Sequence, residues 1–188
     1  MAVNPIYHHT NEKLAEEARW IEKAKKDTKS FEPLYSKYYE QIFRYVYQRM
    51  DDEDMAHDVT SQVFLKAIKN LKKYEFRGVP FASWLYRIAK SELYQAYRDK
   101  KAKRTVNIDS YQLHDFIEEF ESSDNEPNKK KLIQMIAKLN EKEVQLIELR
   151  YFEKRSFKEM GEILEIKENN AKVKTFRVVQ KLKKLFTE

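Results

Sequence analysis

Apolar residues recur every three to four positions along most of this chain, which is the spacing of one face of an α-helix. Two such stretches follow one another, with apolar positions at Leu34, Tyr38, Ile42 and Val46, then at Met55, Val59, Val63 and Ala67. The acidic run at residues 51–54 precedes the second stretch, and carboxylates favour the first turn of a helix. A third helix is predicted over residues 80–101, with Trp84, Leu85, Ile88 and Ala89 on its apolar face.

The last part of the chain predicts two short helices separated by a tight break at residues 165–167. Ser156 can cap the first of them by accepting from the amide three residues later, while Glu159 can accept from the Ser156 amide. Seven Lys or Arg residues and a single acidic residue lie between Lys167 and Lys184. A basic run can be only a solvated helix face, but the capping box and the short break favour a helix-turn-helix that contacts DNA.

Composition favours an all-α fold, because two glycines and four prolines leave little chemistry for hairpin turns. The chain contains no cysteine, which excludes disulfides and thiolate metal sites. Without a signal peptide or a long apolar run, we expect a cytoplasmic protein with no membrane insertion. The four histidines share no ligand spacing and no glycine-rich phosphate loop is present. We therefore expect no catalytic residues, no metal and no cofactor, and an enzyme is the least favoured class.

Charge divides the chain into four parts, with net charges of +1 for residues 1–30, +5 for 31–104, −7 for 105–128 and +7 for 129–188. The third part has no Lys or Arg and ends in a polar stretch that contains a proline, as is typical of a linker. The pattern predicts two small basic helical domains joined by an acidic flexible linker. Two basic modules of this kind are typical of a nucleic-acid binder.

Aromatic and basic residues alternate over residues 72–81, the one segment that contains glycine and proline together. Single-stranded nucleic acid is bound in this way, because bases stack on rings while cations hold the backbone. Tyr74, Phe76 and Phe81 are the candidate rings. Aromatic residues also pack in cores, and this pattern alone leaves both interpretations open.

Motifs in both basic parts resemble bacterial RNA polymerase sigma factors of the extracytoplasmic-function class. The first part carries DMAHDVTSQVFLKA at 54–67, FRG at 76–78 and FASWLYRIA at 81–89, which resemble sigma domain 2. The second carries LNEKEV at 139–144, LRYFE at 149–153, SFKEM at 156–160 and IKENNAKVK at 166–174, which resemble sigma domain 4. The resemblance covers residues 31–104 and 129–186 and implies a subunit that directs promoter recognition and melting, with no catalysis of its own.

The resemblance also implies partners and contact residues. Core RNA polymerase would be bound at the clamp helices of its largest subunit by Asp58, Gln62, Phe64 and Leu65, with Gln62 where the family usually has Glu. The flap of the second largest subunit would contact the apolar side of domain 4, from Val144 through Leu149 and Phe152. An anti-sigma factor commonly accompanies this class. Residues 1–30 lie outside the usual core and could form a docking helix for another DNA-targeting partner.

Promoter DNA would be contacted by both domains. The residues at positions that match minus-10 contacts, including those to single-stranded bases, are Tyr74, Phe76, Arg77, Phe81, Arg87, Lys90, Ser91, Gln95 and Arg98. Those that match minus-35 contacts are Asn169, Asn170, Lys172, Lys174, Arg177 and Lys181. Family members normally carry Gly at position 165 and a Ser cap at position 167, where this chain has Glu and Lys. Weak minus-35 reading is therefore expected. The alternative function is an autonomous helix-turn-helix regulator that does not join the polymerase.

Overall fold

The computed structural model describes residues 10–99, 113, 116–117, 120 and 126–187, with no account of the side chains of 126 and 187. The chain divides into two compact units, and the boundary between them lies after Val106. The described residues contain eight α-helices and no β-strand, which confirms the predicted all-α fold. Most of the predicted linker, residues 105–128, lies outside the described residues.

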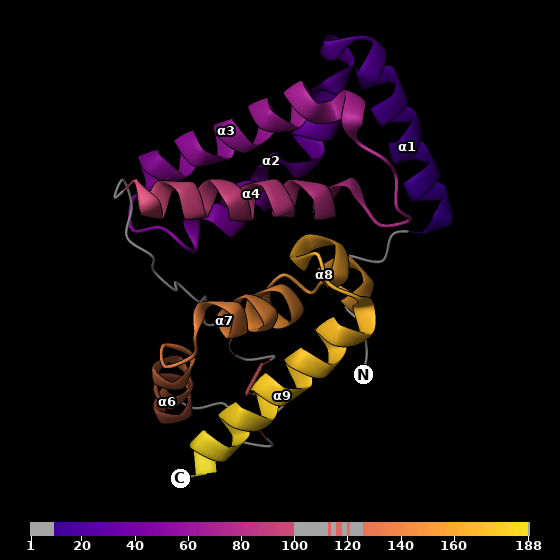
Figure 1. Ribbon diagram of the computed structural model, residues 1–188. Helices are drawn as coiled ribbons and strands as arrows, with labels where there is room; N and C mark the ends of the chain where they lie inside the picture. The colour runs from indigo at the N-terminus through magenta and orange to yellow at the C-terminus, as the bar shows by residue number, and fades with distance from the viewer. Residues whose placement is uncertain (1–9, 100–112, 114–115, 118–119, 121–125, 188) are drawn as a thin grey trace. The chain divides into compact units, whose positions relative to one another are not determined.

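The first domain is built from helices α1 (Asn11–Lys26), α2 (Glu32–Tyr47), α3 (Glu53–Asn70) and α4 (Phe81–Arg98). Short 3-10 turns, η2 (Thr28–Phe31) and η3 (Leu71–Lys73), follow α1 and α3. Helices α2, α3 and α4 pack against one another, and α1 packs on α2 and on η3 (Figure 1). Asp52 caps α3 by accepting from the Met55 amide at 2.8 Å, as the acidic run predicted.

The core of the first domain follows the predicted helical faces. Leu34, Ile42 and Val46 on α2 are fully buried and Tyr38 is nearly so. From α3 and α4, the fully buried hydrophobic residues are Ala56, Val63, Ala67, Phe81, Ala82, Leu85, Tyr86 and Ala89. Side chains from three helices therefore close on one another, which explains why the periodicity was informative.

Helix α1 belongs to this domain and is packed into it. Ile21 and Ala24 are buried, and the Nζ of Lys37 lies 5.4 Å from the centroid of the half-buried Trp20 ring. The side chain of Glu17 is also buried, although it is polar. Helix α1 is thus fixed to its own domain by apolar, cation–π and polar contacts.

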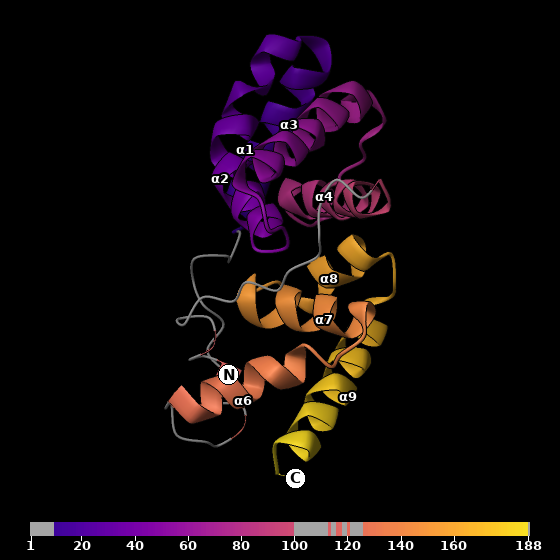
Figure 2. The same cartoon turned by 90° about the vertical axis from the view of Figure 1, so that its left-hand side faces the viewer.

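The second domain contains α6 (Glu126–Ile136), α7 (Glu141–Ile147), the π-helical turn η5 (Glu148–Phe152), α8 (Phe157–Leu164) and α9 (Glu168–Thr187). Helices α6, α7 and α8 all pack against α9 (Figure 2). Val144, Leu149 and Phe152 are buried in this core. These three residues were expected to contact the polymerase flap, and in this structure their apolar side chains are covered within the domain.

Helices α8 and α9 form the predicted helix-turn-helix. Both bonds of the capping box at Ser156 and Glu159 are present. Glu165 ends α8 with a left-handed backbone, φ 57°, a conformation that glycine adopts more readily than any other residue. Gly161 lets the turn pass close to α8, since a Cβ there would lie 2.8 Å from the carbonyl oxygen of Ile166.

Candidate nucleic-acid interface

The loop that precedes α4 and the first residue of that helix carry one exposed ring and two packed rings. Tyr74 is 8% exposed and Phe81 is fully buried, and their ring centroids lie 5.1 Å apart in an edge-on contact. Trp84 completes the cluster at 5.0 Å from Tyr74 and 5.4 Å from Phe81. Phe76 is 47% exposed. Of the three rings predicted to stack on bases, Phe76 is the one that remains a candidate. Tyr74 and Phe81 already pack against neighbouring rings in the domain.

The other predicted minus-10 residues form one stripe along α4. Arg87, Ser91 and Gln95 are spaced by four residues, so they share a helix face, and Lys90 and Arg98 lie beside them. Ser91, Gln95 and Arg98 are exposed, and Arg87 and Lys90 are half-buried. Gln95 donates to Asp99 at 2.8 Å and accepts from Arg98 at 2.6 Å. With the exposed Arg77 in the loop, the first domain presents an aromatic ring beside a polar and cationic helix face.

Helix α9 exposes every predicted minus-35 residue. The exposed set comprises Asn169, Asn170, Lys172, Lys174, Arg177 and Lys181. Two large apolar side chains share this surface, Val173 at 39% exposure and Phe176 at 63%. Sequence reasoning did not assign them. Amides, cations and apolar groups are the types of side chain that contact base edges, phosphates and thymine methyl groups.

Lys181 differs from its neighbours because it is held by an ion pair. Its Nζ lies 2.9 Å from Oε2 and 3.0 Å from Oε1 of Glu143 on α7. The same carboxylate accepts from the Asn140 amide at 3.0 Å and so completes a capping box at the start of α7. Burial raises the pKa of the Glu143 carboxyl, but the bonds from Lys181 and from the Asn140 amide outweigh that effect, and the net pKa is lowered.

Three of the predicted polymerase-binding residues on α3 are exposed and one is buried. Asp58 and Gln62 are exposed, and Leu65 is 47% exposed despite its apolar side chain. Phe64 is 2% exposed and packs against Phe31, Tyr35 and Tyr39. Phe64 is therefore too buried for the direct polymerase contact that was predicted. Its ring packs beneath the exposed Asp58, Gln62 and Leu65 and would support them.

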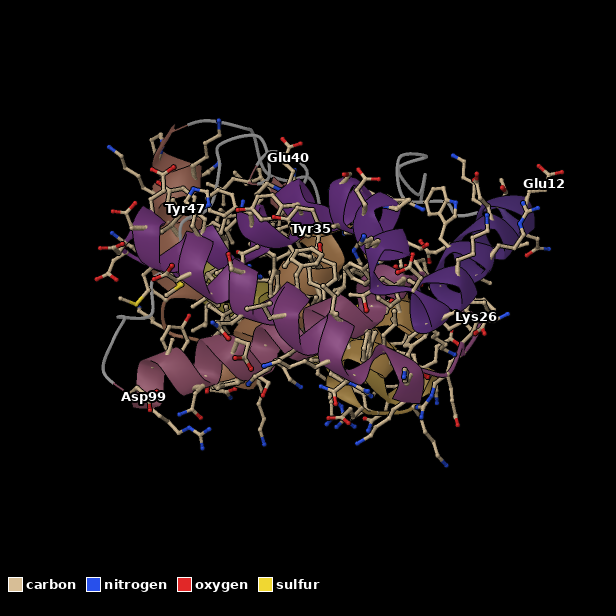
Figure 3. All side chains as sticks on the ribbon, turned by 90° about the horizontal axis from the view of Figure 1, so that it is seen from above. Glu12, Lys26, Tyr35, Glu40, Tyr47 and Asp99 are labelled. Atoms are coloured by element: carbon tan, nitrogen blue, oxygen red, sulfur yellow. The ribbon has the colours of Figure 1, made fainter. Side chains whose placement is uncertain are left out.

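An aromatic ladder runs along α2 beside these α3 residues and was missed by sequence reasoning. It comprises Tyr35, Tyr39, Phe43 and Tyr47, with successive centroids 5.1, 6.3 and 5.7 Å apart. Figure 3 labels its two ends, Tyr35 and Tyr47, each 41% exposed. The spacing of four residues between aromatic rings was the available signal.

His57 joins the aromatic ladder to α3. Its ring stacks on Phe43 at 4.1 Å, and its Nδ1 lies 3.0 Å from the hydroxyl of Tyr39. Burial raises the pKa of the Tyr39 phenol, and the neighbouring Tyr35 adds to the rise. The ladder, His57 and the adjacent Asp58 thus form one continuous surface from two helices.

Within the ranges that the structure describes, no three His, Cys, Asp or Glu side chains are grouped so that they could hold a metal ion. Among those same residues, none of the helices combines the length and the apolarity of a membrane span.

Comparison with known proteins decides the family. Residues 34–103 match Sigma-70 region 2, and residues 129–182 match Sigma-70, region 4. The chain belongs to the extracytoplasmic-function class of the sigma-70 family. Sigma factors bind core RNA polymerase and direct it to promoter DNA, and they are regulatory proteins rather than catalysts. The two matched segments contain all of the surfaces described above.

The individual proteins that this chain resembles include other sigma factors. The sigma factor is 24% identical to the ECF RNA polymerase sigma factor BldN of Streptomyces coelicolor over 85% of its length, and it spans 61% of that protein. It is 30% identical to the RNA polymerase sigma factor SigZ of Bacillus subtilis, covering 83% of this chain and 86% of SigZ. A structure of CnrH in complex with the cytosolic domain of CnrY shares the fold, with 18% identity and a TM-score of 0.60 over 91% of this chain and 97% of that one.

Proposed function

We propose that this sigma factor uses three separate surfaces during initiation. The α2–α3 surface docks on core polymerase, the loop and polar stripe of α4 capture unpaired minus-10 bases, and α9 holds the minus-35 region. The observation that carries the proposal is the exposed Phe76 ring, which lies in the loop before a polar and cationic helix, in the domain that would also carry the docking surface. A stand-alone repressor needs neither of these features.

Docking on the clamp helices is assigned to Asp58, Gln62 and Leu65, with the aromatic ladder of α2 as an extension. Interfaces are enriched in aromatic residues, and charges at their edges guide the approach of the partner. Leu65 and the ladder would supply the buried apolar area, and Asp58 would supply charge. Family members usually have Glu at the position of Gln62, so this chain would rely more on its apolar contacts.

Capture of the minus-10 element is assigned to Phe76 and Arg77 in the loop and to the stripe on α4. Flipping a base out of the duplex costs a few kcal/mol, and stacking on an aromatic ring returns about 1 to 3 kcal/mol per base. Ser91 and Gln95 would read base edges, while Arg87, Lys90 and Arg98 would hold phosphates. Melting then needs no energy source beyond these contacts.

Contact with the minus-35 region is assigned to α9. Asn169 and Asn170 offer amides for base edges, and Lys172, Lys174 and Arg177 are suited to phosphates. Lys181 contributes less to DNA binding, because its charge is shared with Glu143. Transcription takes place in the cytoplasm, where we place the protein. A protein partner that covered the α2–α3 surface would block docking, and such an anti-sigma partner belongs to the same proposal.

Co-purification with core polymerase tests the docking assignment. We expect the double variant Asp58→Lys with Leu65→Ala to lose binding while its circular dichroism stays helical, because both side chains are exposed. Glu12→Lys, a charge reversal on the exposed part of α1, is the matched control and should bind normally. Retained binding by the double variant would contradict the assignment. Promoter binding by the chain without any polymerase would instead favour the autonomous regulator.

A further inference from the structure

Glu17 is a buried carboxylate in the middle of α1 and connects three elements of the first domain. Its Oε2 accepts from the backbone amide of Phe81 at 2.6 Å, and its Oε1 accepts from the Nζ of Lys37 at 3.0 Å. The hydroxyl of Tyr38 also donates to Oε1. Buried charges are normally paired in this way, and the two oxygens here divide their partners between α2 and the start of α4.

The amide that donates to Glu17 belongs to Phe81, the first residue of α4. Pro80 occupies the N-cap position of that helix and provides no side-chain cap. The first amides of a helix have no partner within the helix, and a carboxylate near them is favoured by the helix dipole. Glu17 therefore supplies from α1 the cap that the local sequence of α4 lacks.

The position of this cap matters because α4 begins where the loop of residues 74–80 ends. This loop, to which minus-10 capture is assigned above, is called the minus-10 loop. The loop starts after η3, on which α1 also packs, and it ends at the buried Val79 and Pro80 just before Phe81. Helix α1, whose Glu12 and Lys26 are labelled in Figure 3, thus contacts the chain on both sides of the loop. Phe76 and Arg77, which are exposed, lie between these two fixed ends.

We propose that Glu17 is a positioning residue for minus-10 capture: by capping α4 from α1, it fixes the loop that presents Phe76 and Arg77 to the unpaired strand. The inference rests on the proposed role of that loop. It also gives α1, which precedes the segment matched to Sigma-70 region 2, a function inside its own domain. If the loop adopted the competent arrangement only part of the time, its apparent affinity for DNA would fall by that fraction.

The test compares Glu17→Met with Glu16→Met, a matched change at the exposed neighbouring position. Each variant is assembled with core polymerase. The affinity of the variant for the polymerase is measured first, and then the affinity of the assembled complex for a single-stranded oligonucleotide that carries the minus-10 sequence. We expect Glu17→Met to bind the polymerase like the wild type but the oligonucleotide about tenfold more weakly, because a tenth of the molecules would hold the loop correctly. Glu16→Met should change neither quantity.

Hydrogen exchange provides the readout that a general loss of structure would not mimic. In Glu17→Met, the amides of Phe81 to Ser83 should exchange faster while those at the centres of α2 and α3 stay protected. Glu17→Gln keeps an acceptor for the Phe81 amide without the charge, so it should lie between the wild type and Glu17→Met in both assays. If Glu17→Met does not fold, Glu17→Gln is compared with the wild type in its place.

The outcomes separate this inference from the function on which it rests. Equal oligonucleotide affinity for the Glu17 and Glu16 variants would overturn the positioning role, and so would an equal loss of polymerase and oligonucleotide binding in Glu17→Met. If the wild-type holoenzyme itself bound the minus-10 strand no better than a scrambled strand, the proposed role of the loop would fail instead.

Discussion

The ammonium group of Lys181 on helix α9 lies 2.9 Å from a carboxylate oxygen of Glu143 on α7. The side chain of Lys181 is 48% exposed and that of Glu143 is 20% exposed, so solvent screens the pair only in part. One of the basic residues predicted to bind DNA thus also fastens α9 to the body of the domain.

Glu143→Gln should release Lys181 for phosphate contact while weakening the domain slightly. We expect the slope of log affinity against log salt concentration to steepen by about 1, as for one added phosphate contact. The free energy of unfolding should fall by less than about 1 kcal/mol, because the pair is partly exposed. Filter binding at several salt concentrations measures the slope, and Glu141→Gln controls for the change in charge.

The lowered pKa of Glu143 sets the pH range of this stabilisation. The carboxyl binds its proton less readily in the folded domain than in the unfolded chain, so the contribution is complete above the ordinary carboxyl pKa. It is lost as pH falls through the lowered value. The difference in stability between wild type and Glu143→Gln should therefore be greatest near neutral pH and vanish in acid, which thermal unfolding across pH would show.

Gly161→Ala should disrupt the helix-turn-helix. The added Cβ would lie 2.8 Å from the carbonyl oxygen of Ile166 and 3.3 Å from the amide nitrogen of Glu168. Both are backbone atoms, so the start of α9 must move. We expect a loss of about 1 to 3 kcal/mol, the usual range for overpacking, and weaker DNA binding. Lys158→Ala, at an exposed position of α8, should leave the melting temperature nearly unchanged.

Glu165→Gly should have the opposite effect on the same turn. Glu165 holds a left-handed backbone at φ 57°, which costs a residue with a Cβ about 1 kcal/mol relative to glycine. Part of that gain is offset by the greater freedom of glycine in the unfolded chain. We expect a small rise in the thermal stability of the second domain. A fall would show that contacts of the Glu165 side chain outweigh the strain.

Phe76→Ala and Phe81→Ala should separate binding from folding. Phe76 is exposed, so its removal should weaken the grip on single-stranded DNA by about 1 to 3 kcal/mol and leave the melting temperature unchanged. Phe81 is fully buried, so its removal should destabilise the domain by about 3 to 5 kcal/mol. Permanganate footprinting at equal polymerase occupancy would measure melting. Normal melting with Phe76→Ala would return the base-stacking role to other residues.

Promoter choice should depend more on the minus-10 element than on the minus-35 element. Lys172, Lys174 and Arg177 suit phosphates, and the imperfect turn and cap at Glu165 and Lys167 limit how firmly α9 begins. We expect scrambling of the minus-35 sequence to reduce transcript less than about tenfold, since phosphate contacts are independent of sequence. Scrambling of the minus-10 sequence should silence the promoter. A hundredfold loss at minus-35 would show ordinary sequence reading by α9.

Local patterns predicted the parts of the fold that depend on local physics. The buried faces of α2 and α3, the Asp52 cap and the capping box at Ser156 all follow from residues a few positions apart. The tight break at residues 165–167 was also predicted, and the structure has a left-handed turn at Glu165 within it. Each of these features could therefore be read along the chain.

Features that depend on packing between distant segments could not be predicted. Whether an aromatic ring in the loop is buried depends on which helix covers it, so the sequence did not separate Phe76 from Tyr74 or Phe81. The acceptor for the first amide of α4 lies 64 residues earlier in the chain, at Glu17. No spacing rule reaches that far, and an isolated glutamate on a helix is usually exposed.

The placement of Trp20 and Trp84 gives the first domain an optical signal of its own. They are the only two tryptophans of the chain, and both lie in the first domain, where Trp84 packs with Tyr74 and Phe81 at the base of the loop that precedes α4. Intrinsic tryptophan fluorescence of the unlabelled protein therefore reports on the first domain alone, whereas circular dichroism reports on helices in both. A mismatch between the two unfolding curves would reveal independent melting of the halves without any dye or tag.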